Sequence, residues 1–330
     1  MTDAHPSRTR DGTATMLGRG GRVNREAAPG TGPGSTCSAY AAPPIASVRS
    51  SSGRCPARRS SPWGWRIWEL MTMPVLVGTS GWQYRDWRGR FYPLGLPEQA
   101  WLEYYATAFA TVESNSTFYR LPEAATFEEW ARRTPADFTW ALKMSRYLTH
   151  LRRLREPAGP VELFLGRAAR LGPKLGPILV QLPPGFPADP DRLEAALARF
   201  PARVRVAVEF RDESWYVEEV RAVLTRHGAA LCLADRAGPL TPEWRTADWT
   251  YLRFHEGRGR PWPAYAPDEL AAWAATLARG WGPEADVYAY FNNDPGACAP
   301  ADAVDFARAA AAAGLHPTRV PELPIRRAGE

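Results

Sequence analysis

Short apolar runs alternate with amphipathic stretches along most of the chain, from about residue 75 onward. Eight of these runs are rich in Val, Leu, Phe and Tyr, as buried β-strands are. Most of them are followed by a stretch with helical periodicity. Strand followed by helix, repeated eight times, is the order of a (β/α)8 TIM barrel, which typically has about 250 residues. The sequence therefore predicts an α/β fold, a single-domain (β/α)8 TIM barrel.

The expected strands begin at residues 75, 111, 138, 177, 205, 230, 249 and 287. The expected helices, several opened by Pro or Asp and closed by Gly, cover residues 97–109, 161–172, 190–200, 216–228, 267–280 and 300–314. The sixth unit is weak, because "RAGPLTPEWRTAD" is short and rich in turn residues. A doubly wound open sheet is the structural alternative.

Residues 1–70 have a different composition from the rest of the chain. They are rich in Gly, Ser, Pro, Ala and Arg and have no hydrophobic periodicity, so we expect a disordered segment before a barrel at residues 71–330. Targeting is a minor alternative, because two prolines interrupt the apolar stretch that a secretory signal requires. Met71 and Met73 directly precede the first expected strand, which suggests that translation starts at one of them.

The basic character of the chain comes from its first 70 residues. These contain ten arginines and four acidic residues, which accounts for the whole formal net charge of +6. Residues 71–330 are balanced, so the pI near 9.3 is weak evidence for a nucleic-acid-binding fold. Nucleic acid stays open as a partner, through a local basic patch only.

Cysteine spacing and hydropathy restrict the remaining classes. The four cysteines have neither CxxC nor metal-ligand spacing, which fits a reducing cytoplasm. No run approaches the roughly 20 apolar residues of a membrane helix, so no membrane partner is expected. We find no nucleotide-cofactor motif, and the oligomeric state is not indicated.

Side-chain parity predicts which residues face the interior of the barrel, where the carboxyl ends of the strands carry the active site. In "RVRVAVEFR" the valines at 204, 206 and 208 share the helix-facing side, which leaves Glu209 and Arg211 inside. The same parity gives the polar interior positions Glu113, Asn115, Lys143, Gln181, Arg253, His255, Asn292 and Asp294.

Scarce residue types are concentrated at these strand ends. Beyond residue 70 the chain has three asparagines, of which Asn115 and Asn292 are interior, and its only two lysines are Lys143 and Lys174. Amides can orient hydroxyl or carbonyl groups without adding charge. This placement predicts a site at the carboxyl ends of the strands.

The predicted catalytic residues are Glu113, Lys143, Glu209 and His255. The two carboxylates could act as general acid and base or, with His255, ligate a divalent metal. A structural ion-pair network is the alternative. Lys143 could clamp an anion or form an imine, and His255 could be a proton shuttle, a ligand or a buried structural histidine.

Cations at the strand ends predict an anionic or phosphate-containing small-molecule ligand. The predicted substrate-binding residues are Trp82, Asn115, Arg146, Gln181, Arg211, Arg236, Arg253, Asn292 and Asp294. Trp82 and Trp262 are candidate faces for stacking on a base or sugar. His150 lies past the third strand and could reach the rim together with Arg146.

Seven motifs in order resemble a known family. They are "GTSGWQYRDWRGRFYP", "ESNSTFYRLP", "FTWALKMSRYLTH", "LGPKLGPILVQLPP", "VEFRDESW", "YLRFHEGRG" and "YFNND". Over about residues 75–310 the chain resembles the YecE-like family, domain of unknown function 72. The resemblance implies a TIM barrel and supports the site positions, but this family has no established reaction. Glu256 and Asp302 stand where the family usually has glycine and asparagine.

Three functions remain open from the sequence. The leading hypothesis is an enzyme that acts on an anionic or phosphorylated small molecule by acid/base chemistry, as a hydrolase, lyase or isomerase. The second is a metal-assisted phosphodiester hydrolase acting on nucleic acid, by analogy of fold alone. The third is a barrel that binds a ligand or nucleic acid without turnover.

Overall fold

The computed structural model describes residues 74–235, 241–322 and 324–329, which fold into a single α/β unit. The expected disordered segment, both candidate start methionines and Arg236 lie outside the described residues. The strands are β1 Pro74–Thr79, β2 Thr111–Ser114, β3 Thr139–Lys143, β4 Leu175–Gln181, β5 Val206–Glu209, β6 Ala230–Asp235, β7 Thr250–Phe254, β8 Val287–Phe291 and β9 His316–Pro317.

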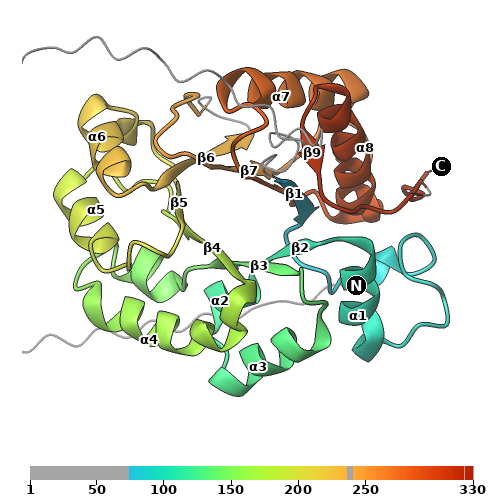
Figure 1. The fold of residues 1–330 in the computed structure, drawn as a ribbon, viewed down its shortest axis with the longest axis horizontal. Helices are drawn as coiled ribbons and strands as arrows, with labels where there is room; N and C mark the ends of the chain where they lie inside the picture. Colours follow the sequence, from blue (N-terminus) through green and yellow to red (C-terminus); the bar gives the residue numbers. More distant parts are fainter. Residues whose placement is uncertain (1–73, 236–240, 323, 330) are drawn as a thin grey trace, which may run out of the picture. The chain divides into compact units, whose positions relative to one another are not determined.

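The helices surround these strands, which lie at the centre of the view in Figure 1. They are α1 Trp101–Ala108, α2 Ser116–Tyr119, α3 Ala124–Arg133, α4 Ala158–Ala168, α5 Pro190–Leu197, α6 Glu218–Arg226, α7 Pro267–Gly280 and α8 Cys298–Ala312. A π-helix covers Tyr147–Leu151. Each long helix buries one apolar face against the strands, as the helical periodicity of the sequence predicts.

All strand pairs are parallel, in the order β2-β3-β4-β5-β6-β7-β8-β1-β9. Alternate side chains of a strand point to opposite faces, so the curled sheet has two apolar layers. The larger layer lies between strands and helices. The smaller one fills the inside of the curl, with Ala141, Ala207, Cys232, Tyr251 and Tyr290 among its members. Parity therefore predicted the interior set correctly.

The seam between β1 and β2 is held by a side chain. Strand β1 pairs with β8 on one side and with the short β9 on the other. Strand β9 pairs only with the start of β1. At the end of β1, the Tyr105 hydroxyl accepts a hydrogen bond from the Thr79 N–H at 2.9 Å and donates one to the Thr111 carbonyl at 3.1 Å. A Cβ at Gly78 would lie 2.4 Å from the Thr111 oxygen, so the close approach of β1 and β2 requires glycine there.

The helix predictions hold in most units. The expected 267–280 helix matches α7, whereas α2, α3 and β9 were not predicted. In the weak sixth unit, no helix is present in the described residues 241–249 before β7.

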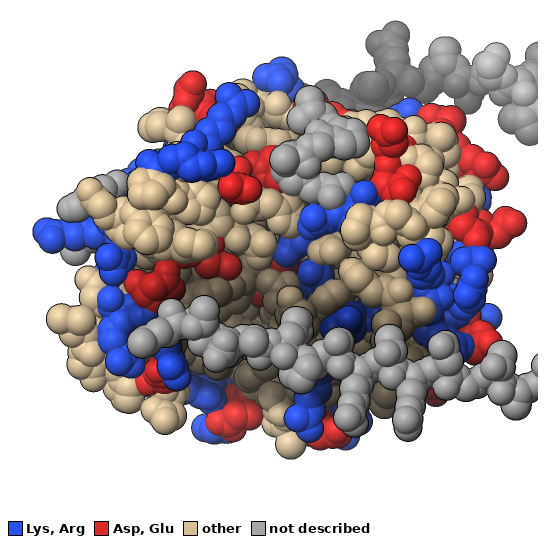
Figure 2. Space-filling view, turned by 180° about the vertical axis from the view of Figure 1, so that it is seen from behind, with Lys and Arg blue, Asp and Glu red and all other residues tan. Residues whose placement is uncertain are grey.

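Figure 2 shows basic and acidic side chains interspersed over one face of the molecule. This mixture agrees with the balanced charge of residues 71–330.

Candidate functional site

A buried guanidinium joins two predicted catalytic carboxylates at the carboxyl ends of the strands. Arg253 on β7 is 2 % exposed. Its Nη2 lies 2.8 Å from Glu113 Oε1, and its Nη1 lies 2.8 Å from Glu209 Oε2. Nη1 also donates to Gln181 Oε1 at 3.3 Å. Arg253, predicted to bind substrate, instead lies beneath the surface as the centre of an ion-pair network.

Glu113 accepts three further hydrogen bonds, one of them from a second nitrogen of Arg253. Tyr251 donates to Oε2 at 2.6 Å, Ser80 donates to Oε1 at 2.7 Å, and Arg253 Nε donates to Oε1 at 3.2 Å. Burial opposes ionisation, but the charges of Arg253 and Lys143 lower the pKa of Glu113. The structure thus places Glu113 as an ionised, fully buried group, and this position does not suit the predicted acid/base role.

The second oxygen of Glu209 contacts two further side chains. Oε1 lies 2.5 Å from Arg211 Nη2 and 3.4 Å from His255 Nε2. Burial alone would raise the pKa of Glu209, but the charge of Arg253 and the contact with His255 hold it well below its usual range. Glu209 is therefore an ionised partner of Arg253, Arg211 and His255.

Contacts on both nitrogens of His255 indicate one tautomer. Asn292 Nδ2 lies 3.5 Å from His255 Nδ1 and can donate to it only if Nδ1 is unprotonated. The proton then lies on Nε2, which faces the Glu209 oxygen. Arg211 Nη2, 3.3 Å from Nε2, competes for the same position and would require the other tautomer. We assign the Nε2–H form because both ring nitrogens then have a partner, Glu209 as the acceptor at Nε2 and Asn292 as the donor at Nδ1. Burial lowers the pKa of His255, so the ring is neutral near pH 7.

Lys143, the last residue of β3, has a different environment from the other buried charges. It is 8 % exposed, and its Nζ lies 4.4 Å from the centre of the Phe118 ring. Within residues 74–235, 241–322 and 324–329, no hydrogen-bond or ion-pair partner reaches its ammonium group. Burial and the charge of Arg253 lower its pKa to about 8. Of the four predicted catalytic residues, Lys143 is thus the buried charge that lacks a direct counter-ion in the described structure.

Two interior residues at the strand ends also present unsatisfied oxygens. Asn115 Nδ2 donates to the Ser80 carbonyl at 3.2 Å, whereas its Oδ1 is buried without a hydrogen-bond partner in the described part of the chain. Asp294 Oδ1 is in the same condition. Burial raises the pKa of Asp294 to about 7. We call Asn115, Lys143, Glu209, Arg211, His255, Asn292 and Asp294 together the mouth.

Two predicted residues lie away from the mouth or at its edge. Trp82 is 6 % exposed and packs edge-on against Trp130 and Trp140, so the expected stacking face is wrong and Trp82 belongs to the core. Arg146 is exposed, just past β3. Asn293, beside Asn292, is buried. Its Nδ2 donates a hydrogen bond to Asp302 Oδ2 at 2.6 Å, which holds this amide away from the interior.

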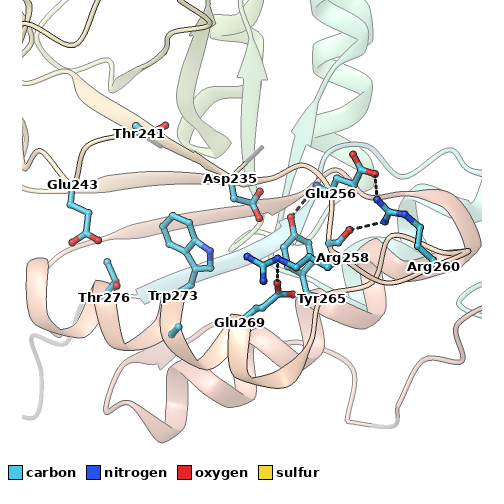
Figure 3. Close-up of a pocket in the computed structure, with 12 residues that line it drawn as sticks. Asp235, Thr241, Glu243, Glu256, Arg258, Arg260, Tyr265, Glu269, Trp273 and Thr276 are labelled. Carbon is cyan, nitrogen blue, oxygen red and sulfur yellow. Dashed lines mark hydrogen bonds and ion pairs between the residues drawn. The ribbon is translucent and has the colours of Figure 1, made fainter. Parts of the chain in front are cut away.

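The sequence did not indicate the cavity of about 750 Å³ that lies beside the mouth (Figure 3). Trp273 of α7 and Asp235 at the end of β6 line it, and an Arg258–Glu269 ion pair of 3.0 Å lies at its edge. Asp235 also accepts the backbone N–H of His255 at 2.8 Å, which links this cavity to the mouth. Burial raises the pKa of Asp235 to about 6.

The residues predicted to ligate a metal do not fit one. The Arg253 guanidinium lies within 2.8 Å of both Glu113 and Glu209, where a cation shared by the two carboxylates would lie. In the ranges that the structure describes, no group of three or more His, Cys, Asp or Glu residues is arranged to hold a metal ion. Arg253 therefore supplies the positive charge that this pair of carboxylates requires.

Replacing Lys143 by Met should raise the free energy of unfolding by about 2 kcal/mol near neutral pH, because the folded state then no longer holds a desolvated ammonium. The lysine pKa is lowered on folding, so the penalty is fully present below about pH 8 and disappears as the pH rises toward 10.5. Urea unfolding of wild type and variant across this range measures the difference.

Lys174 provides the matched control for this experiment. Its ammonium donates to the Thr134 carbonyl at 2.6 Å and to the Ala131 carbonyl. Lys174→Met should therefore give no gain in stability. A Lys143→Met variant that is less stable than wild type at neutral pH would contradict the assignment of Lys143 as an uncompensated charge.

Comparison with known proteins identifies relatives of the whole described unit. The sequence profile of the family described as "Protein of unknown function DUF72" matches residues 76–325. The chain is 30% identical to the UPF0759 protein YecE of Escherichia coli over 145 residues, which are 44% of this chain and about half (51%) of that relative. It is 27% identical to the UPF0759 protein YunF of Bacillus subtilis over 258 residues, 67% of this chain and 89% of the relative.

Solved structures give the same result for the fold. A DUF72 family protein from Thermotoga maritima is 30% identical, with a TM-score of 0.63 over 71% of this chain and 98% of that one. A DUF72 family protein from Enterococcus faecalis matches at 18% identity, with a TM-score of 0.62 over 76% of this chain and 100% of that one. In the described ranges, no helix is long and apolar enough to span a lipid bilayer.

Proposed function

This chain belongs to the DUF72 family of proteins of unknown function, and from its site we propose that it is an enzyme that acts on a small anionic molecule by proton transfer at the mouth. The family resemblance predicted from seven motifs is confirmed. None of the relatives named above carries a reaction in its name, so the proposal depends on the charges and contacts of the mouth.

The observation that carries the proposal is the charge balance of the buried groups. Lys143, Arg211 and Arg253 are cations, and Glu113 and Glu209 are the carboxylates among them. Two of the cations contact these carboxylates directly, and Lys143 does not. Asp294, the other acidic group of the mouth, has a pKa of about 7 and is only partly ionised near neutral pH. The set therefore keeps a net positive charge, which a carboxylate or phosphate group of a ligand would neutralise.

Two further groups of the mouth can transfer protons. His255 is neutral and is oriented by Glu209 and Asn292, while Asp294 has a pKa of about 7. Asp294 therefore titrates near neutrality and the neutral imidazole of His255 can accept a proton, which suits general acid/base chemistry. Asn115 offers an unsatisfied oxygen for a ligand hydroxyl or amide group. In this assignment Glu209 positions His255, and the positive charge at Lys143 attracts the anionic molecule to the mouth.

The adjacent cavity and the surface charge favour a small molecule over a polymer. The cavity of about 750 Å³ beside Asp235 has room for the part of a ligand that does not react. Basic and acidic side chains are mixed on the face in Figure 2, whereas a long polyanion such as nucleic acid is typically bound along a stripe of one sign. The buried thiol of Cys232 fits the proposed cytoplasmic location.

The architecture that presents the mouth is, in our proposal, a (β/α)8 TIM barrel modified at one seam. Eight parallel strands in sequential order, with the candidate site at their carboxyl ends, support this interpretation. The modification is the replacement of the β1–β2 ladder by β9 and by the Tyr105 hydroxyl.

Anion binding tests the proposed function. We expect inorganic phosphate and pyruvate to stabilise the full chain against thermal unfolding, as ligands of the native state do. Lys143→Met should weaken their binding about tenfold to a hundredfold, since a hydrogen bond to a charged group contributes about 1.5–3 kcal/mol. Isothermal titration calorimetry measures the affinities.

Lys174→Met is the control for this measurement and should bind both anions as the wild type does. Equal affinity of Lys143→Met and wild type would contradict the proposed site. A panel of phosphorylated and carboxylated metabolites then distinguishes turnover from binding alone, because only an enzyme forms product.

A further inference from the structure

We propose that Lys143 is a nucleophile that forms an imine with the carbonyl group of a small anionic aldehyde or ketone. This inference rests on the proposed function, because it assigns the substrate class and the covalent step of the same mouth. A lysine can attack a carbonyl carbon only as the neutral amine, so it must be free of a direct carboxylate partner and largely desolvated.

The two lysines of the chain differ in these respects. Lys174 is held as an ammonium by the oxygens of Ala131 and Thr134. Lys143 has the face of Phe118 at 4.4 Å and no such acceptor among the described residues. It keeps a small exposed fraction at the strand end, which leaves a path for a small molecule to its amine.

A neutral imidazole shares the Phe118 ring with Lys143. The His150 ring packs edge-on against Phe118 with the ring centres 4.9 Å apart. Its Nδ1 lies 2.9 Å from Thr149 Oγ1, which can donate its own proton to the Ser145 carbonyl at 3.4 Å. Nδ1 then carries the proton that Thr149 accepts, and Nε2 keeps its lone pair. His150 can therefore exchange protons with groups that react at Lys143.

The backbone that carries His150 is irregular. His150 lies in the π-helix Tyr147–Leu151, and Arg153, Leu154 and Glu156 directly after it have positive φ angles of 46°, 62° and 47°. Single π-turns and residues in the left-handed region cost energy and occur frequently at functional sites. The strain lies in the loop after β3, which is the strand that presents Lys143.

The proposed step balances without an oxidant or a reductant. The neutral amine of Lys143 adds to the carbonyl carbon, and the electron pair of the C=O bond goes to oxygen. The nitrogen gives up one proton and the oxygen takes one, which leaves a neutral carbinolamine. Loss of the resulting hydroxyl group with a second proton releases water and leaves a protonated imine. The iminium retains the positive charge of the former ammonium, and the exposed Arg146 of the same loop is available to the carboxylate or phosphate group of the substrate.

Reductive trapping tests this inference on the full chain. Wild-type protein is treated with borohydride in the presence of glyoxylate, pyruvate or glyceraldehyde 3-phosphate, and the modified lysine is located by peptide mass spectrometry. We expect one reduced adduct on the Lys143 peptide, at least tenfold more abundant than on the Lys174 peptide. Lys143→Arg, which keeps the cation but cannot form an imine, should lose the adduct, and Lys174→Arg should keep it.

The same samples without borohydride are titrated by calorimetry, which separates the two hypotheses. Binding of these anions without an adduct on Lys143 overturns the imine and leaves the proposed function in place. If the protein neither binds these anions nor forms an adduct, the imine and the proposed function are both overturned. Equal labelling of Lys143 and Lys174 also overturns the imine, since it reflects ordinary surface reactivity, and this comparison within the wild-type chain does not depend on the folding of any variant.

Discussion

Replacing Arg253 by Met should lower the free energy of unfolding by about 3–5 kcal/mol, the typical cost of removing one partner from a buried ion pair. The variant leaves Glu113 and Glu209 fully buried without the guanidinium that contacts both of them. Because the charge of Arg253 lowers the pKa of both carboxyls, at least one of them should take up a proton in the folded variant. Urea unfolding at neutral pH measures the loss.

The pH dependence of the Arg253 effect has a defined sign. In the wild type both carboxyl pKa values are lowered on folding, so the two ionised carboxylates stabilise the folded state at pH values above the ordinary pKa of glutamate. This stabilisation is lost as the pH falls through the lowered pKa values. The difference between wild type and Arg253→Met should therefore shrink in acid. Arg132→Met, at an exposed ion pair, is the control and should unfold as the wild type does. Equal unfolding of the two variants would contradict the buried network.

The second large effect is expected at the seam of the sheet. Tyr105→Phe removes the hydroxyl that accepts the Thr79 N–H and donates to the Thr111 carbonyl. Both backbone groups are in fully buried residues, and an unsatisfied buried polar group costs about 1–3 kcal/mol. The variant should therefore lose about 2–6 kcal/mol of unfolding free energy, as measured by urea denaturation.

The neighbouring Tyr104 provides a matched control on the same helix. Its ring packs against Phe91 and Tyr92, away from the seam. Tyr104→Phe should change the unfolding free energy far less than Tyr105→Phe does. If the two variants were equally stable, the β1–β2 junction would not depend on the Tyr105 hydroxyl.

Alternation along the strands was enough to predict most of the interior. Apolar residues such as Val206 and Val208 mark the helix-facing side, and the period of two then places Glu209 inside regardless of the details of packing. The strand starts were predicted within a few residues for the same reason. The seam was not predictable, because the bridge through Tyr105 joins residues on a helix and two strands, and no local pattern encodes it.

Side-chain parity also could not predict the partners of the interior charges. Parity gives the face on which Arg253 lies, but not its depth, and therefore it could not distinguish a ligand-binding arginine from one enclosed by Glu113 and Glu209. Trp82 was placed wrongly for a related reason, since a Trp in a loop sequence can lie in solvent or, as here, against Trp130 and Trp140. Such outcomes depend on contacts between distant segments.

Nuclear magnetic resonance of selectively carbon-13-labelled lysine tests the central claim most directly, because the chain has only two lysines and Lys143→Arg assigns their signals. We expect the Lys143 Cε signal to titrate with a pKa of about 8 and to shift on addition of phosphate or pyruvate, while the Lys174 signal does not respond to either anion. A Lys143 signal that titrates in the ordinary range of lysine and is unaffected by both anions would contradict an uncompensated, anion-binding amine at the mouth.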